Sequence, residues 1–265
     1  MTETEYRQHP AVSRSDLWHF HESPQKFLYH KEHPAEPTPA LLFGQVFHKL
    51  ALEPADFENE YAVAPQCDRR TKEGKALWAA FQEAAVDKVI VPSEMYDQAM
   101  EMVKSLMAVP FAAKLLNGRR EVPFFWNDPL TGEACKCRVD CINEDFSQPI
   151  VVDLKSTTDA TTEAFTRAAI NYGYDLQSAM YAEGVEANIM QKPLFVFIAV
   201  EKDPPYAVNI LQADELLMKR GYGLYRSYLD TYHDCKVTGN WYGYLGKNNQ
   251  INTLALPTWL AKEVE

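Results

Sequence analysis

The chain has 265 residues, 46% of them hydrophobic, so it can bury a sizeable core as one large domain or two small ones. Its formal charge of -11 by itself disfavours nucleic acid, although net charge says nothing about local basic patches. No apolar run reaches the roughly 18–20 residues of a membrane span, and the N-terminus lacks the pattern of a signal peptide, so we expect a cytoplasmic protein that binds no membrane.

Residues 1–39 are polar and interrupted by prolines. Ser13 or Ser15 can cap a short helix, because a serine oxygen accepts from the free amides of the first turn. Ser23 directly before Pro24 is typical of the start of another helix, since proline tolerates the first helical position. We therefore expect short helices in this region.

The next regions are predicted to be helical. Residues 33–40 resemble a linker, and the apolar stretch 40–53 is long enough for a buried helix. Residues 71–117 have apolar residues at three- and four-residue spacing, with an interruption at Pro110. One such apolar set is Leu77, Trp78, Phe81 and Ala85.

The pattern then changes to strands. Residues 121–127 are aromatic and prone to form a strand, 128–132 read as a turn, and 134–142 alternate apolar with polar residues. The remaining expected elements are a strand at 149–156, helices at 161–172 and 174–188, strands at 193–200 and 206–211, a long helix at 213–234 and an aromatic tail at 239–265. This order predicts an α/β fold with a mixed central sheet flanked by helices and a helical N-terminal elaboration.

The cysteines are expected to be buried structural thiols. There are five of them, an odd number, and a reducing compartment keeps thiols free. Cys135 and Cys137 share a face of a predicted strand, but a zinc site needs a second close pair, which the sequence lacks. We therefore expect no zinc.

The triplet Asp153-Leu154-Lys155 ends an apolar strand. Asp153 and Lys155 point to the same face of an extended strand, where ionised groups are costly unless they are paired or bind a metal. A carboxylate that holds a divalent metal, beside a lysine that offsets charge in the transition state, can serve phosphodiester hydrolysis. Asp140 lies near the end of the preceding strand, so two carboxylates face one point, which favours Mg²⁺. The triplet alone could instead be a structural ion pair.

These residues occur in a recognisable order: Gly44-x-x-x-His48, Glu121, Arg138-x-Asp140, Asp153-Leu154-Lys155 and Gln177-x-x-x-Tyr181. The order resembles the RecB-like branch of the PD-(D/E)xK nucleases, and most of all the nuclease domain of RecE-type exonuclease VIII. The resemblance runs from VSRSDL near residue 12 to LPTWLAKE near residue 262. It differs in one respect, because Val139 stands where the family has a proline.

The resemblance implies a restriction-endonuclease-like core within a single nuclease domain, 1–265. Its parts are a mainly helical N-terminal part carrying His48 (1–117), the catalytic sheet and helices (118–212) and a C-terminal helix and tail (213–265).

The resemblance also assigns roles to individual positions. Those that match metal ligands are His48, Asp140, Asp153 and the carbonyl of Leu154. Glu121 matches an acidic residue that supports the metal site, and Lys155 matches the catalytic lysine. Gln177 and Tyr181 match the motif on the following helix, where their spacing puts both on one face, able to orient Lys155 or the substrate phosphate.

Simpler interpretations stay open. His48 lies in an apolar helix and could be a packed core residue, although Gly44, one turn earlier, leaves space for a close backbone approach. Glu121 could pair with Arg119 or Arg120. The two polar residues of the helix motif could be ordinary caps on a core helix.

Candidates for DNA contact are Ser13, Arg14, Ser15, Arg69, Arg70 and Arg138. The first three fall where related ring-forming exonucleases hold the terminal 5′-phosphate, but helix capping suits the serines equally well. The other three belong to basic clusters, which are more often solvated faces than binding sites.

The function that the resemblance implies is Mg²⁺-dependent digestion of linear double-stranded DNA in the 5′-to-3′ direction. This would release 5′-mononucleotides and leave 3′ overhangs for recombination by strand annealing. Mn²⁺ is expected to substitute for Mg²⁺. The resemblance further implies a ring-shaped homo-oligomer, expected to be a tetramer, and a single-strand annealing protein as partner.

Three alternatives compete with this function. A related nuclease with an iron–sulfur cluster needs a set of cysteines near the C-terminus, where only Cys235 lies, so no such cluster is expected. A structure-specific DNA endonuclease of the same fold is harder to exclude. A non-catalytic DNA-binding or assembly subunit should have lost an acidic ligand or the lysine, and here all are present.

Overall fold

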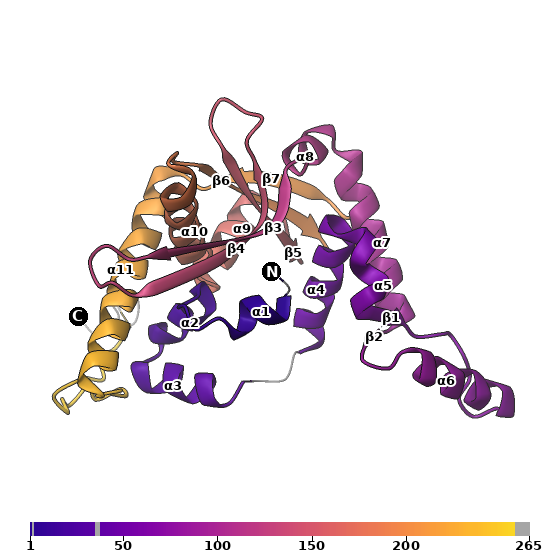
Figure 1. Cartoon of the computed structure of the whole chain (residues 1–265), viewed down its shortest axis with the longest axis horizontal. Helices are drawn as coiled ribbons and strands as arrows, with labels where there is room; N and C mark the ends of the chain where they lie inside the picture. The colour runs from indigo at the N-terminus through magenta and orange to yellow at the C-terminus, as the bar shows by residue number, and fades with distance from the viewer. Residues whose placement is uncertain (2, 35–37, 258–265) are drawn as a thin grey trace.

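The structure is a computed structural model, and it describes residues 1, 3–34 and 38–257. A five-stranded mixed sheet of strand order β3-β4-β5-β6-β7 lies at its centre, with helices on both sides (Figure 1). The strands of this sheet are β3 (Arg119–Asn127), β4 (Ala134–Asn143), β5 (Ile150–Thr157), β6 (Leu194–Glu201) and β7 (Val208–Gln212). This architecture confirms the predicted fold class.

The helices lie mainly before and after the first three strands of the sheet. They are α1 (Glu3–Gln8), α2 (Arg14–Trp18), α3 (Pro24–Glu32), α4 (Pro39–Leu52), α5 (Phe57–Glu60), α6 (Lys72–Ala84), α7 (Ser93–Ala108), α8 (Pro110–Leu115), α9 (Thr162–Asn171), α10 (Tyr174–Ile189) and α11 (Glu215–Thr238). Among the described residues, no helix is both long and apolar enough to cross a membrane.

The start signals seen in the sequence act as predicted. Ser13 caps α2 and closes a capping box with Asp16, and Ser23 caps α3 ahead of Pro24. Pro110 separates α7 from α8. The predicted linker gives way to α4 at Pro39, and residues 35–37 of that linker lie outside the described residues, as does the end of the aromatic tail, 258–265.

The prediction of helix over 71–117 was wrong at one point. Residues Val89–Val91 form a short strand, β2, which pairs in parallel with β1 (Tyr61–Val63). Three consecutive β-branched residues favour a strand, and the helical spacing around them hid that signal. The apolar set around α6 is only partly buried, since Leu77 is 49% exposed and Ala85 is 6% exposed.

Two apolar clusters lie on opposite sides of the sheet. Helices α4 and α7 lie on one side, and α10 and α11 lie on the other (Figure 1). Their buried side chains belong to the two clusters. β5 contributes to both, because its successive side chains alternate between faces: Val152 and Leu154 join the first cluster and Val151 joins the second. The strand that carries the acidic triplet is therefore covered on both faces.

The buried thiols belong to these clusters. Cys135, Cys137 and Cys141 of β4 are fully buried, as predicted, whereas Cys67 is only partly buried. Burial raises the pKa of Cys135 to about 12 and that of Cys141 to about 11. These two thiols therefore stay protonated and behave as small apolar side chains.

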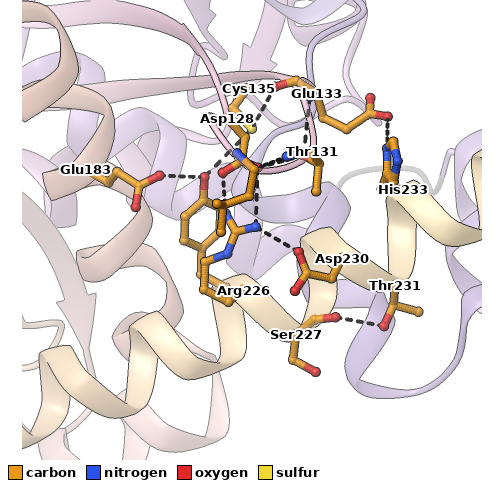
Figure 2. A network of polar contacts seen from close by, with 12 residues as sticks. Asp128, Thr131, Glu133, Cys135, Glu183, Arg226, Ser227, Asp230, Thr231 and His233 are labelled. Carbon is orange, nitrogen blue, oxygen red and sulfur yellow. Dashed lines mark hydrogen bonds and ion pairs between the residues drawn. The ribbon is translucent and has the colours of Figure 1, made fainter.

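A polar network fastens the β3–β4 hairpin to α11 (Figure 2). Arg226 of α11 makes an ion pair with Asp128, whose carboxylate also accepts from the backbone amide of Thr131 at 2.7 Å. Glu133, on the far side of the same turn, lies 2.9 Å from Nδ1 of His233. Both sides of the turn are thus held by one helix.

Candidate active site

The site forms where β4 and β5 separate. The two strands pair antiparallel over only three positions, ending at Cys141 opposite Val152. Beyond that pair Asp140 and Asp153 come next, and the amide of Leu154 donates to Oδ2 of Asp140 at 2.7 Å. Further along β4, Val12 of the N-terminal segment forms a single bridge to Cys135. The short connection between the strands thus brings the two carboxylates together, as expected.

Three side chains from three elements form a possible metal-binding cluster. One ligand atom each from His48 of α4, Glu121 of β3 and Asp140 of β4 lie within 4.8 Å of one another. Nδ1 of His48 is 3.5 Å from Oδ2 of Asp140, and both side chains are partly exposed, at 26% and 14%. His48 is therefore partly exposed and is not packed within the core.

Glu121 joins this cluster through a break in the sheet. The register of β3 with β4 passes from Arg120 opposite Cys141 to Val122 opposite Val139, so Glu121 and Asp140 are skipped. At φ 50°, Glu121 lies in the left-handed region, which costs a residue other than glycine on the order of 1–3 kcal/mol. Such strain tends to occur at functional sites, and here it accompanies the grouping of two acidic side chains.

Asp153 lies outside the three-residue cluster and is held from two sides. Its Oδ1 accepts from Nε2 of Gln177 on α10, and its Oδ2 contacts Nζ of Lys155. The Asp153 side chain is 2% exposed and that of Lys155 is 17% exposed. Gln177 therefore reaches the triplet Asp153-Leu154-Lys155, as predicted. It orients Asp153, whereas the sequence suggested that it would orient Lys155 or the substrate phosphate.

Burial and charge act against each other in this pair. Burial raises the pKa of Asp153, and the nearby ammonium of Lys155 opposes that rise. Burial of Lys155 alone would lower its pKa, but the carboxylates of Asp153 and Asp140 outweigh it and raise the pKa. The lysine is thus kept as a cation that can face an anionic substrate.

The residues present fit a divalent cation. Oδ2 of Asp153 is buried and has no hydrogen-bond partner within the described part of the chain, its contact there being the ion pair with Lys155. Carboxylate oxygens together with one imidazole form a donor set suited to Mg²⁺ or Mn²⁺. His48, Glu121 and Asp140 would hold such an ion, with Asp153 beside them.

Aromatic side chains of α10 and one arginine lie on one side of Lys155. The ring of Tyr174 lies 4.8 Å from Nζ of Lys155, and Tyr181, further along α10, packs edge-on against Phe195. Burial raises the pKa of both tyrosines, so their hydroxyl groups remain neutral. Sequence reasoning missed Tyr174, although its spacing of three from Gln177 puts both residues on one face of α10.

Arg14 lies close enough to these side chains that Tyr181, Tyr174 and Asp153 influence its pKa. Its guanidinium donates to the carbonyl of Tyr172 and stacks 5.3 Å from the ring of Trp18. Burial lowers its pKa, and its Nε has no hydrogen-bond partner among the residues described. Arg14 is therefore a partly buried cation beside the acidic triplet.

Two of the simpler expectations about Glu121 and Gly44 were wrong. Glu121 pairs with Nε of Arg138 at 2.9 Å across the sheet, and not with either of the two arginines before it. A side-chain carbon at Gly44 would lie 4.0 Å from Oγ of Ser156, an ordinary contact distance, so no close backbone approach requires glycine there. Arg138 is thereby part of the metal-site surroundings.

The other candidates for DNA contact are dispersed. Ser13 caps α2, with its hydroxyl 3.0 Å from that of Ser15. Arg69 and Arg70 are exposed and precede α6, which stands away from the central sheet beside β1 and β2 (Figure 1). The structure therefore does not bring this arginine pair to the site.

Comparison with known proteins supports the fold. The family described as "PDDEXK-like domain of unknown function (DUF3799)" matches residues 13–253. A crystal structure of a candidate exonuclease from Eubacterium rectale is similar at a TM-score of 0.65 and 15% identity, covering 99% of this chain and 97% of that one. That of SSO0001 covers 86% of this chain and 81% of its own at 13% identity, and its TM-score of 0.43 is too low to bear on the fold. No curated protein matches the chain.

Proposed function

This chain belongs to the PDDEXK-like DUF3799 family, and from that premise we propose that it is a Mg²⁺-dependent exodeoxyribonuclease acting in the cytoplasm. The proposed reaction digests one strand of linear duplex DNA 5′-to-3′, releases 5′-mononucleotides and leaves a 3′ overhang. The observation that carries the proposal is the cluster of His48, Glu121 and Asp140 beside the buried pair of Asp153 and Lys155. A divalent-cation site next to a held ammonium suits phosphodiester hydrolysis.

The residues of the site have separate roles in the proposed reaction. A divalent cation bound there would supply Lewis acidity toward the scissile phosphate. Lys155, kept cationic by its carboxylate neighbours, donates to the attacking water or to the oxygens on which charge develops. Gln177 holds Asp153 in place from α10, and the Leu154 amide does the same for Asp140. Preorganised groups of this kind lower the barrier because they need not reorient during the reaction.

The preference for ends rests on two supports. The Eubacterium rectale protein with the similar fold is described as a candidate exonuclease. Arg14 offers a cation near Asp153, and its buried Nε has no hydrogen-bond partner in the described ranges of the chain. It stands at the position where the RecE-type resemblance puts the terminal 5′-phosphate. We propose that Arg14 holds this phosphate, while Ser13 serves as a helix cap.

The same resemblance supports the proposed assembly. We infer a ring-shaped homo-oligomer, expected to be a tetramer, that works with a single-strand annealing protein in recombination of prophage type. A ring also reconciles the charge of -11 with a DNA substrate, because basic side chains can line a channel while acidic ones face outward.

One assay tests the proposed function. Purified protein is incubated with 5′- or 3′-end-labelled linear duplex and, separately, with covalently closed circles, each with Mg²⁺ or with EDTA. The proposal expects Mg²⁺-dependent loss of the linear substrate, early release of the 5′ label as a mononucleotide, and intact circles. Nicking of circles at a similar rate would indicate an endonuclease, and no cleavage of any DNA would contradict the proposal.

A further inference from the structure

The segment that begins α6 is an exposed basic surface on an acidic protein. Within residues 68–75 four cations are exposed: Arg69, Arg70, Lys72 and Lys75. The chain as a whole has a formal charge of -11, so its overall field repels a polyanion. Any contact with DNA away from the metal site must therefore come from a local basic surface such as this one.

These four cations make no ion pair with the residues that the structure describes, in contrast to most exposed cations on the other helices. Lys26, Lys104 and Arg167, for example, each pair with a glutamate three or four residues away. The positions three and four residues after Lys72 and Lys75 hold no acidic residue. Asp68 stands four residues before Lys72 but forms no ion pair with it among the residues described.

The segment has two acidic residues, Asp68 and Glu73, and neither forms a salt bridge with these cations in the described part of the chain. The carboxylate of Asp68 accepts from the backbone amide of Arg70 at 2.9 Å, and its carbonyl accepts from the hydroxyl of Thr71. Asp68 therefore shapes the turn before α6. It forms no salt bridge within the described chain.

Trp78 holds one of the cations in position. The guanidinium of Arg69 lies 3.4 Å from the centre of the Trp78 ring, and the centre of the Phe81 ring lies 5.3 Å from that of Trp78. Stacking on a tryptophan restrains the arginine without neutralising it. An ordered, unpaired guanidinium has less conformational entropy to lose when it binds a phosphate.

We propose that this basic segment, residues 69–75, grips the phosphate backbone of duplex DNA outside the metal site. The inference rests on the proposed function, because it takes the nuclease substrate as the partner. Closely spaced, unpaired cations need no detailed shape match to bind a duplex, whose charge repeats about every 1.7 Å along its axis. Trp78 is a positioning residue in this arrangement.

The test uses the full chain with four substitutions, R69Q/R70Q/K72Q/K75Q. Its matched control is K192Q/K219Q, which removes two exposed cations that make no ion pair within the described residues. Binding of an end-labelled duplex is measured by fluorescence anisotropy in EDTA across a series of salt concentrations. Each lost phosphate contact should reduce the slope of log affinity against log salt by about 0.9. We expect the slope to fall by about 3.6 for the fourfold variant, which loses four contacts, and by less than about 1 for the control.

Turnover kinetics distinguish a role of the basic segment in DNA binding from a role in the chemical step. With Mg²⁺ and linear duplex, the fourfold variant should show a raised KM and an unchanged kcat. W78A alone should reduce the salt slope by about 1. An unchanged slope and KM in a variant of a protein that cleaves linear duplex would overturn this inference alone. A changed oligomeric state with unchanged DNA affinity would assign the surface to a second copy of the chain instead. Failure of the unsubstituted protein to bind or cut DNA would remove the proposed function together with this inference.

Discussion

The backbone amide of Leu154 donates a 2.7 Å hydrogen bond to Oδ2 of Asp140, so a backbone group of β5 orients a carboxylate of β4. Leu154 is fully buried in the core between the sheet and α4, which holds that amide in place. Asp140 is therefore oriented by the same strand that carries Asp153 and Lys155. The carbonyl of Leu154, which the family resemblance names as a metal ligand, stays a prediction.

Asp153→Asn should reduce Mg²⁺-dependent cleavage to background while the fold survives. The amide has nearly the same shape, so the core keeps its packing. The negative charge that offsets the ammonium of Lys155, and that would offset a bound metal cation, is lost. Specific activity and melting temperature are measured on one preparation. Substantial activity in the folded variant would contradict the assignment of Asp153 to the site.

Lys155→Met should lower kcat by about 10²–10³-fold and leave metal affinity within a few-fold. The ammonium is proposed to act on the water or the developing charge, and such groups contribute at the transition state. Calorimetric titration with Mn²⁺ measures the binding, and single-turnover cleavage measures the rate. Lost metal binding at an intact fold would assign Lys155 to the structure of the metal site.

Gln177→Met should weaken metal affinity or activity by about 10–100-fold, the usual cost of removing a group that orients a ligand. Methionine keeps the volume and removes only the hydrogen bond to Oδ1 of Asp153. The half-saturating Mg²⁺ concentration for cleavage is the measurement. Gln250→Met, an exposed substitution in the C-terminal tail, is the control and should change nothing. Equal values for both variants would leave Gln177 as an ordinary helix residue.

His48→Ala should cut Mg²⁺-supported activity severely and change stability by less than about 1 kcal/mol. The side chain is 26% exposed, so its removal leaves no enclosed cavity. An imidazole is a better ligand for Mn²⁺ than for Mg²⁺, so the deficit should differ between the two ions. Thermal melts and activity assays are run together, with His33→Ala at an exposed position as the control. A destabilised but fully active variant would remove His48 from the site.

Asp128→Asn should destabilise the protein by about 1–3 kcal/mol at neutral pH, because the guanidinium of Arg226 loses its charged partner in the turn and keeps only its ion pair with Asp230. Burial of Asp128 alone would raise its pKa, but donors from Arg226 and Thr131 hold the pKa below its ordinary value of 3.8.

A depressed pKa means that this stability is complete above about pH 4 and is lost as the pH falls through the folded-state pKa. The difference in free energy of unfolding between Asp128→Asn and the unsubstituted protein should therefore become smaller as the pH falls below about 4. Urea melts from pH 7 to pH 3 measure it, and a difference that stays constant would contradict the role of the ion pair.

Local pattern alone determined the elements of the catalytic sheet. The apolar run before Asp153 predicted β5, and the alternation around Cys135 and Cys137 predicted β4, because neighbouring side chains in a strand face opposite sides. The same rule put Asp153 and Lys155 on one face of β5, where their side chains are in contact. The short connection between the two strands also predicted that Asp140 would come near, and it does.

Tertiary structure decided what local pattern could not. His48, Glu121 and Asp140 come from three separate elements, and only the crossing of α4 over the sheet brings them within 4.8 Å. Glu121 pairs with Arg138 on the neighbouring strand because contacts across a sheet depend on strand pairing, which sequence distance does not reveal. Leu77, on the apolar face of α6, is exposed for a related reason: periodicity tells which residues share a face, but whether that face is buried depends on which elements pack against it.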